Sequence, residues 1–181
     1  MNDVASLEPD DASLAEMERM NDAQDSIRNA FVVIVGDHVE DAERIESLMV
    51  ELLEEDGYTV DAVVRTGSVK REIRKALETA VIGGADLAIT VGGVGFGPRA
   101  VTPEATRKIL DVRVQGIEQA LRASGLAAGA VEAGLSRGVA GISGQTVVVN
   151  LAESRAAIRD GMATLGPLVT HVLADLGSWS V

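Results

Sequence analysis

The sequence predicts an α/β domain of three layers, α/β/α, with a mostly parallel sheet and one antiparallel hairpin strand. Two continuous apolar runs, at residues 31–35 and 87–91, have the composition of central strands that are buried on both faces. Segments with helical spacing alternate with such runs, and this alternation is typical of a sheet covered by helices. Residues 139–142 and 146–151 flank a short glycine-containing turn, which indicates the antiparallel hairpin.

The first half of the domain is predicted as strand, helix, strand, helix. Residues 31–35 form the first strand, which ends at Gly36-Asp37. Residues 40–55 carry apolar side chains at helical spacing, and Gly57 is placed to end that helix because glycine readily adopts the left-handed conformation there. Residues 58–65 are the second strand and residues 69–81 the second helix.

The second half begins with the strand at residues 87–91 and a glycine-rich loop. Thr102 is a good N-cap and Pro103 a good first helical residue, so we expect a helix to begin directly after this loop. The remaining predicted elements are helices at residues 102–110 and 115–123, the hairpin, and a last helix at 156–176 with a break at Gly166-Pro167.

The length of 181 residues, with 46% hydrophobic content, predicts a single domain with a substantial core. Residues 1–29 hold eight acidic and two basic residues, a net charge of −6, and we interpret them as a flexible acidic extension. A partner-binding or oligomer-bracing arm is the alternative for this segment. The domain itself is expected over residues 30–181.

The net charge of −12 argues against nucleic acids and anionic membranes as partners, because both would be repelled. The acidic, lysine-poor composition favours a halophilic source, with an ordinary acidic mesophilic protein as the alternative. The chain has no cysteine and two isolated histidines, so we expect no dedicated metal site. It has no long apolar run and its start lacks the features of a secretory signal, so we expect a cytoplasmic protein.

The glycine-rich loop is the strongest functional signal. Gly92, Gly93 and Gly95 follow a buried strand, and Arg99 and a helix start come next. Backbone N–H groups on such a loop suit a phosphate or another anion, and Arg99 would add a forked donor. The spacing matches neither a P-loop nor a dinucleotide fingerprint, so a tight connection without a ligand is the alternative.

Residues 90–106, TVGGVGFGPRAVTPEAT, resemble the TTGGTG…PRDVTPEAT signature of the MogA/MoaB family of molybdenum cofactor biosynthesis proteins. Residues 135–151, LSRGVAGISGQTVVVNL, resemble that family's second signature, LSRAVAGxRGxTLIxNLPG. The resemblance spans about residues 30 to 176 and implies a molybdopterin-binding-like domain that assembles into trimers or hexamers. It implies molybdopterin, a phosphorylated pterin, as the ligand, and ATP and Mg²⁺ as further cofactors if the protein is catalytically active. The ligand-binding candidates are Gly92, Gly93, Gly95, Arg99, Ser136, Arg137, Gly144, Thr146 and Asn150.

The departures from the family pattern fall where chemistry is expected. Ala100 stands in place of the acidic residue of PRDVTPE, and Arg65-Thr66-Gly67 in place of Pro-Asp-Asp/Glu. Adenylyl transfer needs carboxylates that hold Mg²⁺ and neutralise charge, so we predict a degenerate active site with little or no activity. Asp37, which would lie at the same sheet edge as the glycine loop, is the remaining weak catalytic candidate, and Glu153 is a poorer one.

Three functions are compatible with these residues. The chain is a divergent molybdopterin adenylyltransferase, a non-catalytic paralogue that binds a pterin phosphate or a related anion, or an oligomeric scaffold or regulatory partner in which Ser136, Arg137 and Asn150 only brace turns.

Overall fold

The computed structural model describes residues 27–36 and 39–178. It contains a six-stranded sheet with the order β2-β1-β3-β6-β5-β4. The strands β1 (Arg28–Val35), β2 (Tyr58–Thr66), β3 (Leu87–Val91) and β6 (Thr146–Leu151) are parallel. The strands β5 (Ala140–Ser143) and β4 (Val112–Arg113) extend the sheet by antiparallel pairing.

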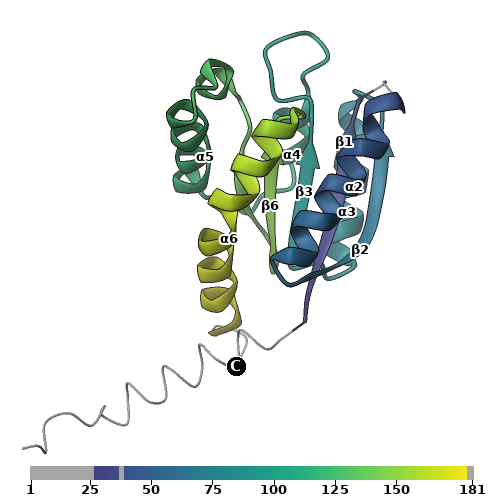
Figure 1. Cartoon of the computed structure of the whole chain (residues 1–181). Coiled ribbons are helices and arrows are strands. Elements are labelled where there is room, and N and C mark those ends of the chain that lie inside the picture. Colours follow the sequence, from purple (N-terminus) through teal and green to yellow (C-terminus); the bar gives the residue numbers. More distant parts are fainter. Residues whose placement is uncertain (1–26, 37–38, 179–181) are drawn as a thin grey trace, which may run out of the picture.

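Helices cover both faces of this sheet, which confirms the predicted α/β/α layers (Figure 1). The helices α2 (Val39–Glu55), α5 (Gln115–Ala127) and α6 (Arg155–Ser178) pack on one face. The helices α3 (Lys70–Ile82) and α4 (Thr102–Arg107) pack on the other. Within β1, Val32 and Ile34 face the first layer while Phe31 and Val33 face the second, as the strand alternation requires.

Several boundaries differ from the sequence prediction. The strand β1 begins at Arg28, so the last two residues assigned to the acidic extension belong to the sheet. The helix α4 ends at Arg107, and the chain then forms β4, a strand that the sequence analysis missed because its two residues are exposed. A 3₁₀ helix, η2 (Val131–Leu135), was also not predicted. Residues 1–26 of the predicted extension lie outside the described residues.

The predicted break in the last helix is wrong, because α6 runs through Pro167 without interruption. Proline removes one hydrogen bond of the helix ladder and bends the helix without ending it. Figure 1 shows this change of direction in the middle of α6. Among the described residues, no helix is long and apolar enough to cross a membrane.

Candidate functional site

The glycine turn after β3 requires glycine for steric reasons. Gly92 and Gly93 have φ values of +103° and +69°, which side chains rarely adopt. A Cβ atom on Gly92 would lie 2.5 Å from the carbonyl oxygen of Val35, and one on Gly93 would clash with the Thr102 hydroxyl. The Thr102 hydroxyl donates to the carbonyl of Gly92 at 2.9 Å. Thr102 is therefore not the predicted N-cap: Val101 takes that position, and Thr102 closes the turn.

The loop at residues 93–101 projects beyond the sheet edge (Figure 1). In the described part of the chain, no backbone N–H of residues 93–97 has a hydrogen-bond partner in the protein. Arg99 is exposed on the returning side of this loop, and Phe96 is 78% exposed. The start of α4 adds little to these donors, because Thr102 N already donates to the Gly93 carbonyl and Pro103 has no N–H.

Arg137 holds this loop from the side. Its backbone N donates to the Val94 carbonyl at 2.8 Å, and its Nε donates to the Gly95 carbonyl at 2.7 Å. Its two terminal nitrogens donate to the Ala100 carbonyl and to Glu104 Oε1. The hydrogen bond from Arg137 lowers the pKa of Glu104. The guanidinium predicted to bind ligand thus lies at the glycine loop, where it contacts the protein itself.

Asn150 lies on β6 and is 3% exposed. Its amide nitrogen donates to the hydroxyls of Thr90 at 2.8 Å and Thr106 at 2.9 Å, and its oxygen accepts from Val139 N at 3.1 Å. Asn150 on β6 is therefore joined to β3, to α4 and to the residue that precedes β5, beneath the glycine turn. Ser136 Oγ accepts from Gly138 N at 3.2 Å and shapes the turn that presents Arg137.

Gly144 and Thr146 lie at the opposite end of the sheet. In the parallel pair β3–β6, Leu87 faces Val147 and Val91 faces Leu151, so Thr146 begins β6 where β3 begins. Six residues of strand put Thr146 roughly 17 Å from the glycine turn. There the Thr146 hydroxyl donates to the Ala85 carbonyl at 2.6 Å and Gly144 N donates to Asp111 at 2.7 Å. The structure does not bring these two candidates to the loop.

A cleft of about 840 Å³ opens at the carboxyl edge of the sheet, between the end of β1, the first turns of α2 and residues 153–155. This is within the usual size of ligand pockets. Gly36 lines it, whereas Asp37, the weak catalytic candidate, lies outside the described residues. Glu153 Oε2 would lie 3.2 Å from a Cβ atom on Gly92, so this carboxylate reaches the glycine turn.

The family resemblance implies an acidic residue at two positions, and neither position has a carboxylate in this chain. Ala100 has no side-chain ligand atom. Its carbonyl accepts from Arg137 and its N–H donates to the Gly97 carbonyl. At the end of β2, Arg65 pairs with Glu46 at 2.7 Å, and the buried Thr66 hydroxyl has no hydrogen-bond partner within the part of the chain that the structure describes. Among the described residues, no three His, Cys, Asp or Glu side chains are grouped to hold a metal ion.

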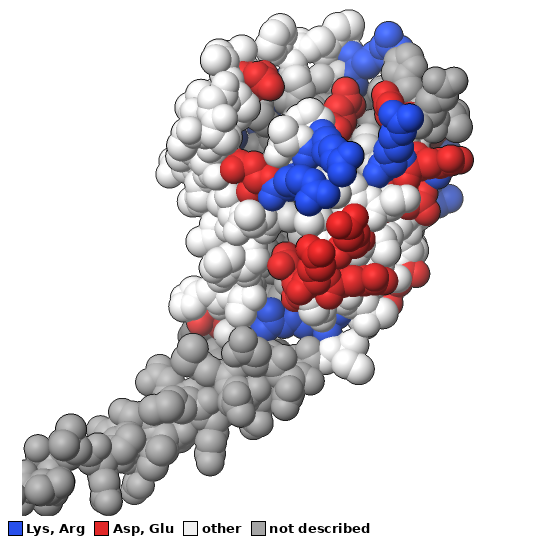
Figure 2. Space-filling view, viewed as in Figure 1, with Lys and Arg blue, Asp and Glu red and all other residues white. Residues whose placement is uncertain are grey.

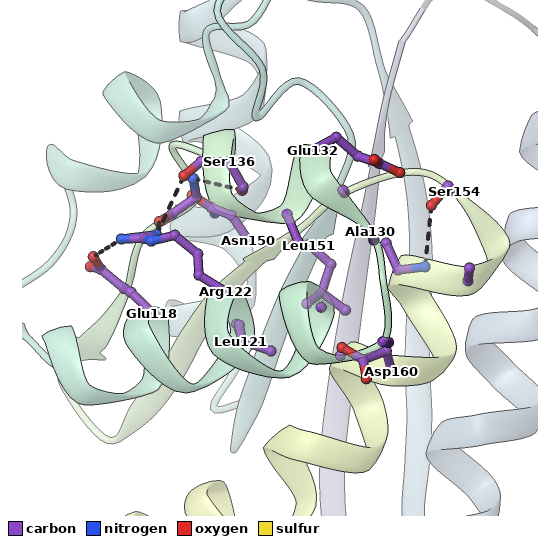
Figure 3. Close-up of a pocket in the computed structure, with 18 of the residues that line it drawn as sticks. Glu118, Leu121, Arg122, Ala130, Glu132, Ser136, Asn150, Leu151, Ser154 and Asp160 are labelled. Atoms are coloured by element: carbon purple, nitrogen blue, oxygen red, sulfur yellow. Dashed lines mark hydrogen bonds and ion pairs between the residues drawn. The ribbon is translucent and has the colours of Figure 1, made fainter.

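A second cavity, of about 140 Å³, lies between α5, η2 and the turn from β6 to α6 (Figure 3). Ser154 lines both this cavity and the cleft. Apolar residues, many of them Gly or Ala, make most of its wall. The remaining lining residues are polar or charged: Ser136, Asn150, Ser154, Glu118, Arg122, Glu132 and Asp160. An apolar cavity of about 150 Å³ holds roughly one benzene ring, so this one has room for a single ring.

Glu118, a buried carboxylate on α5, was missed by the sequence analysis. It is 2% exposed and accepts from Arg113 at 2.6 and 2.8 Å, from Arg122 at 3.3 Å and from Ala140 N at 3.2 Å. Burial alone would raise the pKa of Glu118, but the hydrogen bonds and charges of these partners lower it. In the sequence, Glu118 and Arg122 are four residues apart, which resembles an exposed helix pair and hides the burial.

Comparison with known proteins places this geometry in a family. Residues 31–171 match a family model described as a probable molybdopterin binding domain. The chain is 52% identical to a molybdopterin biosynthesis protein from Mycobacterium abscessus, over 86% of this chain and 100% of that one, with a TM-score of 0.81.

Two curated relatives extend this comparison. The chain is 29% identical to molybdenum cofactor biosynthesis protein B of Bacillus cereus, over 88% of this chain and 96% of that protein. It is 40% identical to the gephyrin of Dictyostelium discoideum over 92 residues, which make up 51% of this chain but only 13% of that relative. Together with the shared fold, these matches show that the chain belongs to the MogA/MoaB family of molybdenum cofactor biosynthesis proteins.

Proposed function

We propose that this chain acts in molybdenum cofactor biosynthesis by binding molybdopterin, or a related phosphorylated pterin, at the glycine loop. The observation that carries the proposal is the run of backbone N–H groups at residues 93–97, which have no partner within the described protein. Backbone N–H groups that make no hydrogen bond within the protein are available to donate to an anion, which needs no counter-charge from each side chain. Arg99, exposed on the same loop, supplies a positive charge.

The fused ring system of a pterin would lie in the cleft beside the loop, because the smaller cavity has room for a single ring only. The cleft borders the glycine turn through Glu153, and the single-ring cavity shares the Ser136–Gly138 turn with Arg137. Both are lined by the segment that follows β6, so a phosphate on the loop and a ring beside it would contact one continuous surface. The carboxyl edge of a mostly parallel sheet is where ligands bind in folds of this class.

We further propose that adenylyl transfer is absent or severely reduced. Loss of one charge-stabilising group at an active site costs on the order of 10²-fold or more in rate, and both Ala100 and Thr66 lack the carboxylate that the family resemblance implies. Glu153 and Asp37 are the acids that would have to replace them. ATP and Mg²⁺ would be cofactors only if this replacement succeeds.

The test uses molybdopterin, ATP and Mg²⁺ with the full chain. Calorimetry is expected to detect molybdopterin binding, and the adenylylated product is expected to be absent or to form far more slowly than with a family member that has both acids. Arg99→Ala should weaken binding, whereas Arg74→Ala, which removes the same charge from α3, should not. Product formation at the rate of relatives with both acids would refute the proposed loss of adenylyl transfer. Absence of binding would refute molybdopterin as the ligand.

A homo-oligomer, a trimer or hexamer, is the second proposal and supports a scaffold role. The strand β4 is the sheet's outer strand at its antiparallel edge, and its Val112 is 56% exposed. Leu126, near the C-terminal end of α5, and Val131 and Leu135 in η2 are also at least half exposed. Unpaired edges and exposed apolar groups are commonly covered by a second subunit. Sedimentation that shows only monomer at micromolar concentration in high salt would contradict this assembly.

A further inference from the structure

A continuous series of polar contacts joins the buried Glu118 to the glycine loop. The Glu118 side chain is 2% exposed, and a carboxylate buried to this degree needs the two arginines that pair with it. One of them, Arg113, lies on the edge strand β4. The other, Arg122, lies one helical turn further along α5 and points toward the loop segment at residues 136–138.

Arg122 is held on one side by Glu118 and donates on the other side to two backbone carbonyls. These belong to Ser136, at 3.4 Å, and Gly138, at 3.2 Å, the residues on either side of Arg137 (Figure 3). A guanidinium that bonds both neighbours of a residue fixes that residue's backbone orientation. Gly138 lies close to β6, since a Cβ atom there would be 3.1 Å from the Asn150 carbonyl oxygen.

The position of Arg137 in turn determines that of the glycine loop. The carbonyls of Val94, Gly95 and Ala100 all accept from Arg137. The N–H groups of residues 93–97 contribute no hydrogen bond within the described protein, so these carbonyl contacts are a large part of what orders the loop.

We propose that Glu118 is a positioning residue for the glycine loop, and that its negative charge acts through Arg122 and Arg137 to hold the loop N–H groups in place for an anion. Glu118 contacts no loop residue itself, so its effect on binding is indirect. This inference rests on the proposed anion site for its effect on affinity, and its effect on loop mobility is independent of any ligand.

The test compares Glu118→Gln with Ser124→Ala, a control on the same helix. The Ser124 hydroxyl donates to Asp160 at 2.8 Å, so the control also removes a contact between helices, but one that does not lead to residues 136–138. Both are made in a chain carrying Phe96→Trp and Trp179→Phe, so that fluorescence anisotropy decay reports on the loop. Inorganic pyrophosphate is the binding probe.

Glu118→Gln is expected to increase the local mobility of the loop tryptophan and to weaken pyrophosphate binding about fivefold or more. Ser124→Ala should change neither quantity, even where it lowers the melting temperature. The effects of Glu118→Gln and Arg137→Lys on affinity should be non-additive, although the two residues are not in contact, and a purely structural role would leave them additive. Unchanged mobility in Glu118→Gln overturns the inference.

Two further outcomes are distinguishable. If the unsubstituted chain binds no pyrophosphate, the proposed anion site fails, and the anisotropy measurement still decides the role of Glu118. If Glu118→Gln does not fold, Arg122→Lys replaces it. One terminal nitrogen of Arg122 donates to both carbonyls and the other to Glu118, and a single ammonium cannot contact both sides at once. Arg122→Lys must then increase loop mobility, and a loop as rigid as in the control again overturns the inference.

Discussion

The conformation of the glycine turn depends directly on Gly92. We expect Gly92→Ala to lower the free energy of unfolding by about 1–3 kcal/mol, because alanine there combines an unfavourable φ with a close contact to the Val35 carbonyl. Gly97→Ala is the matched control, since a Cβ atom at that position meets nothing within 4 Å. Urea unfolding measures both, and equal stability of the two variants would show that the turn relaxes freely.

The ionisation of Glu118 gives the protein's stability a dependence on pH. Its pKa in the folded chain lies below the ordinary value of 4.5, so its stabilising contribution is present above that value and is lost as the pH falls through the folded pKa. The difference in unfolding free energy between the unsubstituted chain and Glu118→Gln should therefore be largest near neutral pH and shrink in the acid range. A difference independent of pH would mean that Glu118 contributes by packing alone.

Among the helices, α6 contains Pro167 in its interior and bends in its middle (Figure 1). Inside a helix, alanine is about 3 kcal/mol more favourable than proline. Replacing proline also raises the conformational entropy of the unfolded chain, which lowers the unfolding free energy by up to about 1 kcal/mol. Pro167 is exposed, so Pro167→Ala should raise the unfolding free energy by about 1–2 kcal/mol in a denaturant titration. A loss of stability instead would indicate that the packing of α6 against α5 requires the bend.

The elements that the sequence predicts well are those with strong periodicity. The apolar runs of β1, β3 and β6 and the helical spacing of α2 and α3 report burial directly, because tertiary packing selects those residues. The elements missed, β4 and η2, are short and exposed, so their residues carry no burial pattern.

The candidate site was predictable only in part. Gly92 and Gly93 are identified by their local sequence, since a turn with positive φ needs glycine. Gly144 and Thr146 share a sequence signature with Ser136 and Asn150, but strand direction puts them at the other end of the sheet. The contact of Glu118 with Arg113 depends on how β4 lies against α5, which spacing along one helix does not reveal.

For the whole molecule, the acidic surface predicts a response to salt. Figure 2 shows acidic side chains gathered over α2, where Glu51, Glu54 and Glu55 line a shallow depression. Raising KCl from about 0.1 M to 1 M shortens the screening length from about 10 Å to 3 Å, so the melting temperature should rise. Glu51→Gln combined with Glu54→Gln and Glu55→Gln should flatten that rise. A melting temperature that falls with KCl would argue against a halophilic source.

Proteolysis of the projecting loop is expected to depend on whether an anion is bound there. Phe96 stands 78% exposed on a segment whose N–H groups make no hydrogen bond within the described protein, and such a segment fits readily into a protease cleft. Chymotrypsin should therefore cut after Phe96 before it attacks the sheet. An anion held by the same N–H groups would tighten the segment and slow the cut, so the rate of a single cleavage would measure ligand binding without any label. Cleavage at Phe96 that proceeds equally fast with saturating pyrophosphate would show that the bound anion leaves the loop as open as before.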